Sequence, residues 1–152
     1  MYDFFMRNVG KKVWRFGENE TLLTDKVYEI VSVREKTSQW NTKYSVYVLR
    51  YGEELVEVVP NECVFVADDS LSEEDKVARY LSDNEIFTEE VYFPNDENEL
   101  HATIYGDWKH SHKRADWLME QIGYAFVNEI QVEDSEEDYY GAIHIYRKEN
   151  NE

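Results

Sequence analysis

Short runs of alternating apolar and polar residues occupy the first 67 positions and predict β-strands. The segment 9–16 alternates in this way, and further runs follow at 27–33, 44–49, 55–59 and 64–66. No helical period interrupts them. Five short strands in fewer than 70 residues are typical of a small closed β-barrel. The order and spacing of the strands resemble the SH3-like barrels of Tudor and KOW modules. This resemblance implies a fold and no binding residues.

A different pattern begins at residue 68. Ser70 and Glu73 have the spacing of a capping box, and the apolar positions that follow predict a helix to about residue 83. Strands are expected at 86–93 and 99–105, then a helix that buries residues three and four apart, then strands at 125–132 and 139–147. Helix-strand-strand, twice, predicts a two-layer α+β sandwich with an antiparallel sheet. The expected fold class is therefore α+β, with a barrel at 1–67 and a sandwich at 68–152.

The charge is divided between these two segments very unequally. The chain of 152 residues carries 33 acidic and 16 basic side chains, a net charge of −17. Residues 1–67 contribute −1 and residues 68–152 contribute −16. Direct binding to a phosphate backbone is disfavoured, because such binding depends on lysine and arginine. The imbalance favours a non-enzymatic module that docks a basic or nucleic-acid-binding protein. One form of such a module is a mimic of nucleic acid, as in acidic inhibitors from phages and mobile elements.

Strand parity predicts an interaction face on the second segment. Leu100, Ala102 and Ile104 are expected to face the helices, together with Phe87, Val91 and Phe93 and with Gly141, Ile143 and Ile145. The alternate positions then form an outward face rich in tyrosine and histidine: Tyr92, His101, Tyr105, Tyr140, His144 and Tyr146. The barrel, a second copy of the chain or a partner protein could cover this face.

An acidic turn and a basic cluster form the remaining charged features. The acidic patch consists of Glu133, Asp134, Glu136, Glu137 and Asp138. Lys109, Lys113 and Arg114 stand near the start of the second helix, where positive charge opposes the helix dipole. Pairing of this cluster with the acidic turn is favoured over an anion bound at the helix start.

Two histidines two residues apart supply the alternative, enzymatic hypothesis. His110 and His112 would share one face of an extended segment, and Asp107 or His144 could complete a metal site. In an extended segment Asp107 would lie on the opposite face from His110, so it could join this set only if the chain turns between them. The corresponding function is a metal-dependent hydrolase or phosphoesterase; otherwise no cofactor is expected.

Other classes find no support in the residues. The chain lacks a nucleophile elbow, a P-loop and a dinucleotide fingerprint. The single cysteine, Cys63, is expected to be a buried structural thiol. No apolar run approaches the ~20 residues of a membrane helix, and the first residues lack the layout of a signal peptide. A cytoplasmic protein without a membrane partner is the expectation.

Overall fold

The computed structural model describes residues 2–17, 19, 21–94, 98–133 and 140–149. The chain divides into two compact units, Met1–Val66 and Ala67–Glu152, which are treated separately below. Each unit contains one antiparallel sheet, so the fold class is α+β. Among the described residues, no helix combines the length and apolar character needed to cross a membrane.

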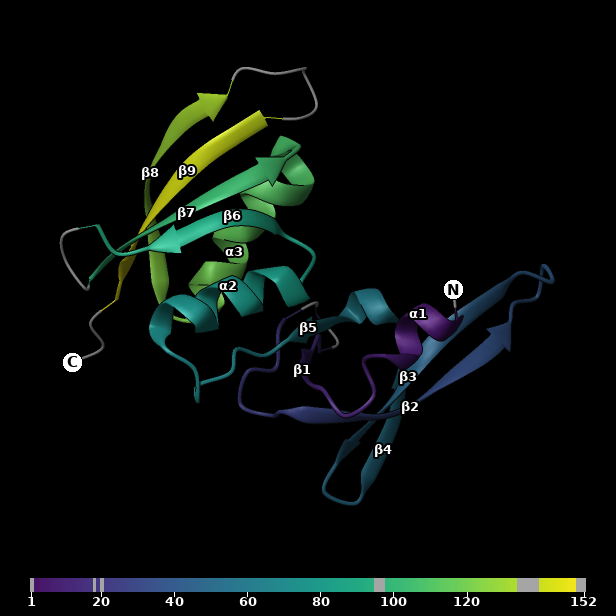
Figure 1. Ribbon diagram of the computed structural model, residues 1–152. Helices are drawn as coiled ribbons and strands as arrows, with labels where there is room; N and C mark the ends of the chain where they lie inside the picture. The colour runs from purple at the N-terminus through teal and green to yellow at the C-terminus, as the bar shows by residue number, and fades with distance from the viewer. Residues whose placement is uncertain (1, 18, 20, 95–97, 134–139, 150–152) are drawn as a thin grey trace. The chain divides into compact units, whose positions relative to one another are not determined.

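The first unit is a five-stranded sheet in the order β4-β3-β2-β1-β5 (Figure 1). The strands are β1 (Lys12–Arg15), β2 (Tyr28–Thr37), β3 (Lys43–Tyr51), β4 (Glu54–Val58) and β5 (Cys63–Phe65). A bulge between Ile30 and Ser32 interrupts β2, where an extra residue locally bends and twists a strand. In the described residues the edge strands β4 and β5 do not pair with each other. The sheet is therefore open, and the expected closed barrel is not confirmed.

One cluster of apolar residues forms the core of this unit. Val13, Tyr28, Ile30 and Leu49 are essentially inaccessible to solvent, and Cys63 lies among them. A short helix that the sequence pattern did not predict, α1 (Tyr2–Met6), adds Phe5 to the cluster. A single 3₁₀ turn, η1 (Pro60–Glu62), separates β4 from β5. Burial raises the pKa of the Cys63 thiol to about 12, which keeps it protonated and weakly nucleophilic at neutral pH.

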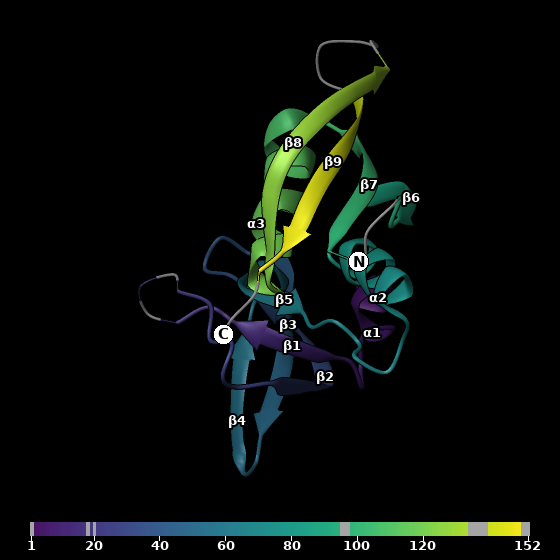
Figure 2. The ribbon, with the colours of Figure 1, turned by 90° about the vertical axis from the view of Figure 1, so that its left-hand side faces the viewer.

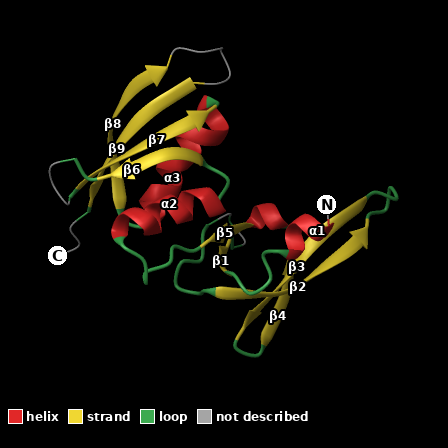
Figure 3. Cartoon of the chain, viewed as in Figure 1, coloured by secondary structure: helices red, strands yellow, loops and turns green. Residues whose placement is uncertain are grey.

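The second unit is a four-stranded sheet in the order β6-β7-β9-β8 with two helices on one side (Figures 1 and 3). Its elements are α2 (Glu73–Asp83), β6 (Phe87–Tyr92), β7 (Glu99–Gly106), η2 (Trp108–His112), α3 (Lys113–Gln121), β8 (Tyr124–Glu133) and β9 (Tyr140–Lys148). We call the side of the sheet that α2 and α3 cover the inner face, and the opposite side the outer face. Figure 2 shows β8 and β9 running side by side as long curved strands.

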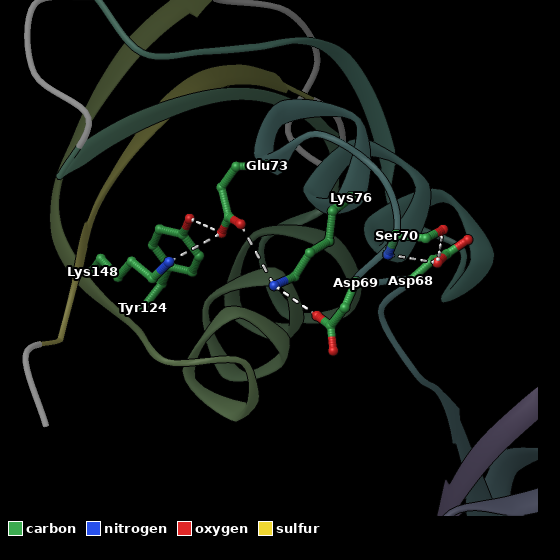
Figure 4. Close-up of polar contacts among 7 residues, drawn as sticks. All are labelled: Asp68, Asp69, Ser70, Glu73, Lys76, Tyr124 and Lys148. Carbon is green, nitrogen blue, oxygen red and sulfur yellow. Dashed lines mark hydrogen bonds and ion pairs between the residues drawn. The ribbon is translucent and has the colours of Figure 1, made fainter.

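Polar contacts tie the start of α2 to the beginning of β8 and the end of β9 (Figure 4). The Tyr124 hydroxyl donates a 2.5 Å hydrogen bond to Glu73 Oε2, and Lys148 Nζ lies 3.7 Å from the same oxygen. Ser72 caps α2 by accepting from the Asp75 N–H, whereas the Ser70 hydroxyl donates to Asp68. The helix therefore begins two residues later than the predicted capping box would place it.

The side chains of β9 face the opposite sides of the sheet from those predicted. In the register with β7, Tyr146 lies opposite Leu100, His144 opposite Ala102, and Ala142 opposite Ile104. Directly opposed residues share a face, so these three β9 side chains lie on the inner face. His144 and Tyr146 are completely buried there. The assignment of Gly141, Ile143 and Ile145 to the helix side is wrong.

A bulge explains a second error of parity, in β6. Phe87 pairs with Tyr105 and Thr88 with Ile104, but Glu90 pairs with Thr103. The extra residue, Glu89, shifts the alternation by one position. Phe87 therefore lies on the outer face, with 64% of its surface exposed, and Thr88 lies on the inner face. Beyond the bulge, Val91 is on the inner face and Tyr92 on the outer face, as predicted.

Candidate metal centre

Three ligand-type side chains from three different elements converge on the inner face. His112 comes from η2, Glu129 from β8 and His144 from β9, and one donor atom of each lies within 4.8 Å of the other two. His112 Nδ1 is 2.8 Å from His144 Nε2, and Glu129 Oε2 is 3.4 Å from the same Nε2. Both imidazole rings are fully buried. Imidazole and carboxylate are the usual nitrogen and oxygen ligands of zinc.

A widened helical turn directs His112 into this position. The N–H groups of Ser111 and His112 both donate to the Asp107 carbonyl, and the Lys113 N–H donates to the Trp108 carbonyl, so η2 is a turn of π-helix. Such turns are uncommon and frequently occur at functional sites. His112 occupies the last position of the turn, directly before α3, and is buried, while Lys109 and His110 are exposed.

A β-bulge directs Glu129 in a comparable way. Phe126 pairs with Tyr146 and Asn128 with Ile145, which leaves Val127 as the extra residue. Without that residue Glu129 would fall on the outer face. With it, Glu129 stands opposite His144 on the inner face.

The second nitrogen of each imidazole is held by an acceptor. His112 Nε2 donates to the Gly106 carbonyl at 3.1 Å, and His144 Nδ1 donates to Asp116 Oδ1 at 2.8 Å. The same Asp116 oxygen accepts a 2.7 Å hydrogen bond from the Tyr146 hydroxyl. Metal-binding histidines almost always donate their other N–H to a carboxylate or a backbone carbonyl in this manner.

These two hydrogen bonds indicate which nitrogen of each ring carries the hydrogen. A carbonyl and an ionised carboxylate only accept, so His112 Nε2 and His144 Nδ1 each carry the hydrogen. In the neutral rings His112 Nδ1 and His144 Nε2 are then both lone pairs, and they face each other at 2.8 Å. Two opposed lone pairs repel. A cation between or beside the two nitrogens, either a metal ion or one shared proton, would remove this repulsion.

The carboxylates distinguish between these two cations. Glu129 Oε2 is buried and accepts no hydrogen bond, and a buried unpaired oxygen of this kind costs free energy. Two carboxylates, of Asp116 and Glu129, stand beside the two imidazoles. A divalent ion would compensate more carboxylate charge than a single proton, and imidazole with carboxylate is the donor set of such an ion. Burial and these two carboxylates raise the pKa of Tyr146 well above its usual value, so its hydroxyl remains a donor.

Aromatic rings surround the centre. Phe126 contacts the rings of His144 and Tyr146, with centroids 5.7 and 6.2 Å apart, and Trp108 stacks on His112 at 6.1 Å. Gly106, which supplies the carbonyl for His112, has φ = 134°, and an added Cβ would collide with Ser111. Glycine at this position is thus required by both the backbone conformation and the close approach.

The predicted metal ligands are brought together only in part. His112 and His144 meet, but Asp107 and His110 pair with each other: Asp107 Oδ1 accepts from the His110 N–H at 3.1 Å, and Asp107 Oδ2 lies 2.7 Å from His110 Nδ1. The His110 side chain is 77% exposed. The hydrogen bonds from His110 lower the pKa of Asp107 although partial desolvation opposes the shift.

Sequence reasoning missed Glu129 and Asp116. Asp116 was discoverable, because it follows His112 by four residues and therefore shares its side of a helix. Glu129 was not, since its orientation depends on a bulge that has no signature in the sequence.

The residues of the predicted interaction face are divided between the two faces of the sheet. Tyr92, His101 and Tyr105 lie on the outer face, whereas His144 and Tyr146 are buried on the inner face. The side chains of Tyr140 and Glu133, and Asp134, Glu136, Glu137 and Asp138, lie outside the described residues. The favoured pairing of the basic cluster with that acidic turn stays a prediction. The Asp107 cap already occupies the helix start where an anion was considered.

Comparisons of the chain with protein-family models, with curated proteins and with solved structures found no match. The function is therefore inferred from the geometry of the centre.

Proposed function

We propose that the protein binds one divalent transition-metal ion, zinc in the first instance, through His112, Glu129 and His144. The observation that carries the proposal is the pair of imidazole nitrogens that face each other at 2.8 Å while the other nitrogen of each ring donates elsewhere. A tetrahedral zinc ion with Zn–N distances of about 2.0–2.1 Å would separate the two nitrogens to about 3.3 Å.

The ion would also connect three elements of the second unit. His112 precedes α3, Glu129 lies on the edge strand β8, and His144 lies on the central strand β9. A ligand that binds only the folded state stabilises it by about 2.7 kcal/mol at a free concentration 100-fold above Kd. Zinc is thus expected to raise the unfolding temperature of the second unit.

Metal content and calorimetric zinc titration of the purified full chain test the proposal. We expect about one zinc ion per chain, removed by a chelator and restored by added zinc. His112→Ala and His144→Ala should abolish the binding, and Glu129→Gln, which preserves the shape of the side chain, should weaken it. His110→Ala and His101→Ala are the matched controls and should retain it. A wild-type chain that takes up no zinc, or equal losses in the controls, would contradict the proposal.

The number of donors supports hydrolytic chemistry as a second candidate function. Within the described residues the centre offers three protein donors, and catalytic zinc sites combine three protein ligands with a water molecule in the fourth position. Zinc lowers the pKa of such a water to about 7 and makes it a nucleophile. Zinc-dependent turnover of p-nitrophenyl phosphate or acetate, lost in His144→Ala and retained in His110→Ala, would support this function. Stoichiometric zinc without turnover would restrict the function to metal binding.

For the first unit we propose an SH3-like module. The strand order supports this assignment, because β1 lies between β2 and β5 and the bulge in β2 bends the sheet. Hydrogen exchange of the β4 and β5 edge amides tests it, since a closed barrel would protect them and an open sheet would not.

A further inference from the structure

We propose that the outer face of the four-stranded sheet binds a partner protein that presents an apolar patch bordered by lysine and arginine. This inference is independent of the metal centre, which lies on the inner face. It replaces the tyrosine face expected from the sequence with the set of side chains that the register places there.

The middle of the outer face is apolar and aromatic. The central strand β9 contributes Ile143 and Ile145, which stand opposite Thr103 and His101 of β7. The Tyr105 ring lies over Gly141, where an added Cβ would collide with it. Ile145 and Thr103 are buried, with 9% and 8% of their surfaces exposed, so the middle of the face offers little accessible apolar surface.

The exposed apolar side chains of this face lie on the two edge strands. Phe87 on β6 is 64% exposed and contacts Tyr105 with centroids 5.8 Å apart. Ile130 on β8 stands opposite Ile143 and is about half exposed. Exposed aromatic side chains beside a packed apolar surface are typical of the residues that contribute most to protein–protein affinity.

Carboxylates border the face on the side of β6 and β7. Glu90 stands opposite Thr103 and is exposed, and Glu89 accepts a 2.6 Å hydrogen bond from the Tyr105 hydroxyl. Glu99 contacts His101 at 3.1 Å and Arg147 at 3.6 Å. Arg147 is the single lysine or arginine that the described register places on this face, so the border is net negative.

This charge selects among the occupants of the face. A second copy would bring its own acidic border, on a unit of net charge −16, against the first. Like charges that face each other across an interface oppose association. Nucleic acid is disfavoured for the same reason. A protein with basic residues around an apolar patch complements both the charge and the exposed side chains.

A synthetic peptide with alternating lysine and leucine serves as the probe, titrated into the isotopically labelled full chain and followed by amide NMR. We expect shifts at Thr103, Ile143 and Ile145, with an affinity that falls steeply as salt is added. Phe87→Ser should weaken binding about tenfold. Leu55→Ser, which alters a side chain of nearly equal exposure (63%) in the first unit, is the matched control and should not.

Charge reversal provides the second comparison. Glu90→Lys should weaken binding of the peptide, while Glu53→Lys, an exposed position in the first unit, should have little effect. Equal losses from both reversals, or shifts spread over both units, would show that only net charge attracts the peptide and would overturn the proposal. Concentration-dependent dimerisation that shifts the same outer-face amides would overturn it in favour of a second copy. Because removal of zinc by a chelator should leave peptide binding unchanged, this test is separate from that of the metal centre.

Discussion

The two faces of the four-stranded sheet treat the same residue types in opposite ways. On the inner face His144 and Tyr146 are fully buried. His144 Nδ1 and the Tyr146 hydroxyl each donate to Asp116, and His144 Nε2 faces His112 Nδ1. On the outer face His101 and Tyr105 are only partly buried and pair with Glu99 and Glu89. Burial of polar groups is costly unless they are satisfied. Loss of a hydrogen-bond partner should therefore destabilise the inner cluster more than the outer face.

The largest expected effect comes from exchanging the buried tyrosine. Tyr146→Ser removes a fully buried ring and leaves Asp116 without one donor, and we expect it to lower the free energy of unfolding by about 3–5 kcal/mol. Tyr105→Ser on the outer face should cost about 1 kcal/mol or less. Denaturant unfolding of both variants measures the difference. Similar losses would contradict the assignment of the two faces.

A smaller effect is expected from the glycine beside the centre. Gly106→Ala forces a Cβ onto a residue with φ = 134° and against Ser111. We expect a loss of about 1–3 kcal/mol from backbone strain, and displacement of the carbonyl that holds His112 should also weaken zinc binding. Gly52→Ala, also at positive φ but with open space for a Cβ, is the control and should leave zinc binding intact. Unchanged zinc affinity in Gly106→Ala would show that this carbonyl does not position His112.

Asp116 should affect affinity more than the fold. Asp116→Asn keeps the size of the side chain but removes the charge that orients the His144 ring, so we expect zinc affinity to fall about 10–100-fold. Glu120→Gln removes a charge from an exposed position at the other end of α3 and is the matched control. Calorimetry compares the two. Equal affinities in both variants would exclude a positioning role for Asp116.

The smallest effect concerns the exposed pair Asp107 and His110. Because the folded state lowers the pKa of Asp107, its contribution to stability is complete above the unfolded pKa, near 3.9, and is lost as pH falls through the lower folded value. Asp107→Asn should therefore be less stable than the wild type at pH 7, and the gap should narrow in acid. Thermal unfolding at several pH values measures it. A gap that widens in acid would contradict this assignment.

Helices and strands of the second unit were accessible from the sequence because their apolar spacing is regular. Ala115, Leu118 and Met119 are buried as the helical period predicts. Gly123, at φ = 90°, follows the end of α3 as expected of a left-handed cap. Leu100, Ala102 and Ile104 also face the helices as predicted.

The facing of β9 could not be obtained by the same reasoning. Its isoleucines and its histidine and tyrosine alternate, and hydrophobicity alone assigns the isoleucines to the core. The structure places His144 and Tyr146 on the inner face, where Asp116 accepts a hydrogen bond from each, and Ile145 on the outer face, where it is also buried. Such an exchange depends on partners from α3 and β8, which are remote in sequence. The bulges at Glu89 and Val127 are equally silent in the pattern, and each reverses a face.

The central claim is that His112 Nδ1 and His144 Nε2 share a metal ion, and imidazole nitrogen NMR of the full chain with and without zinc tests it most directly. The account predicts that His112 Nε2 and His144 Nδ1 keep their hydrogens in both samples. The two facing nitrogens should change their chemical shifts when one equivalent of zinc is added, and in the zinc-bound sample neither should carry a hydrogen. A hydrogen that stays on one of the facing nitrogens, with shifts unaffected by zinc, would contradict the claim and identify the pair as a proton-bridged structural element.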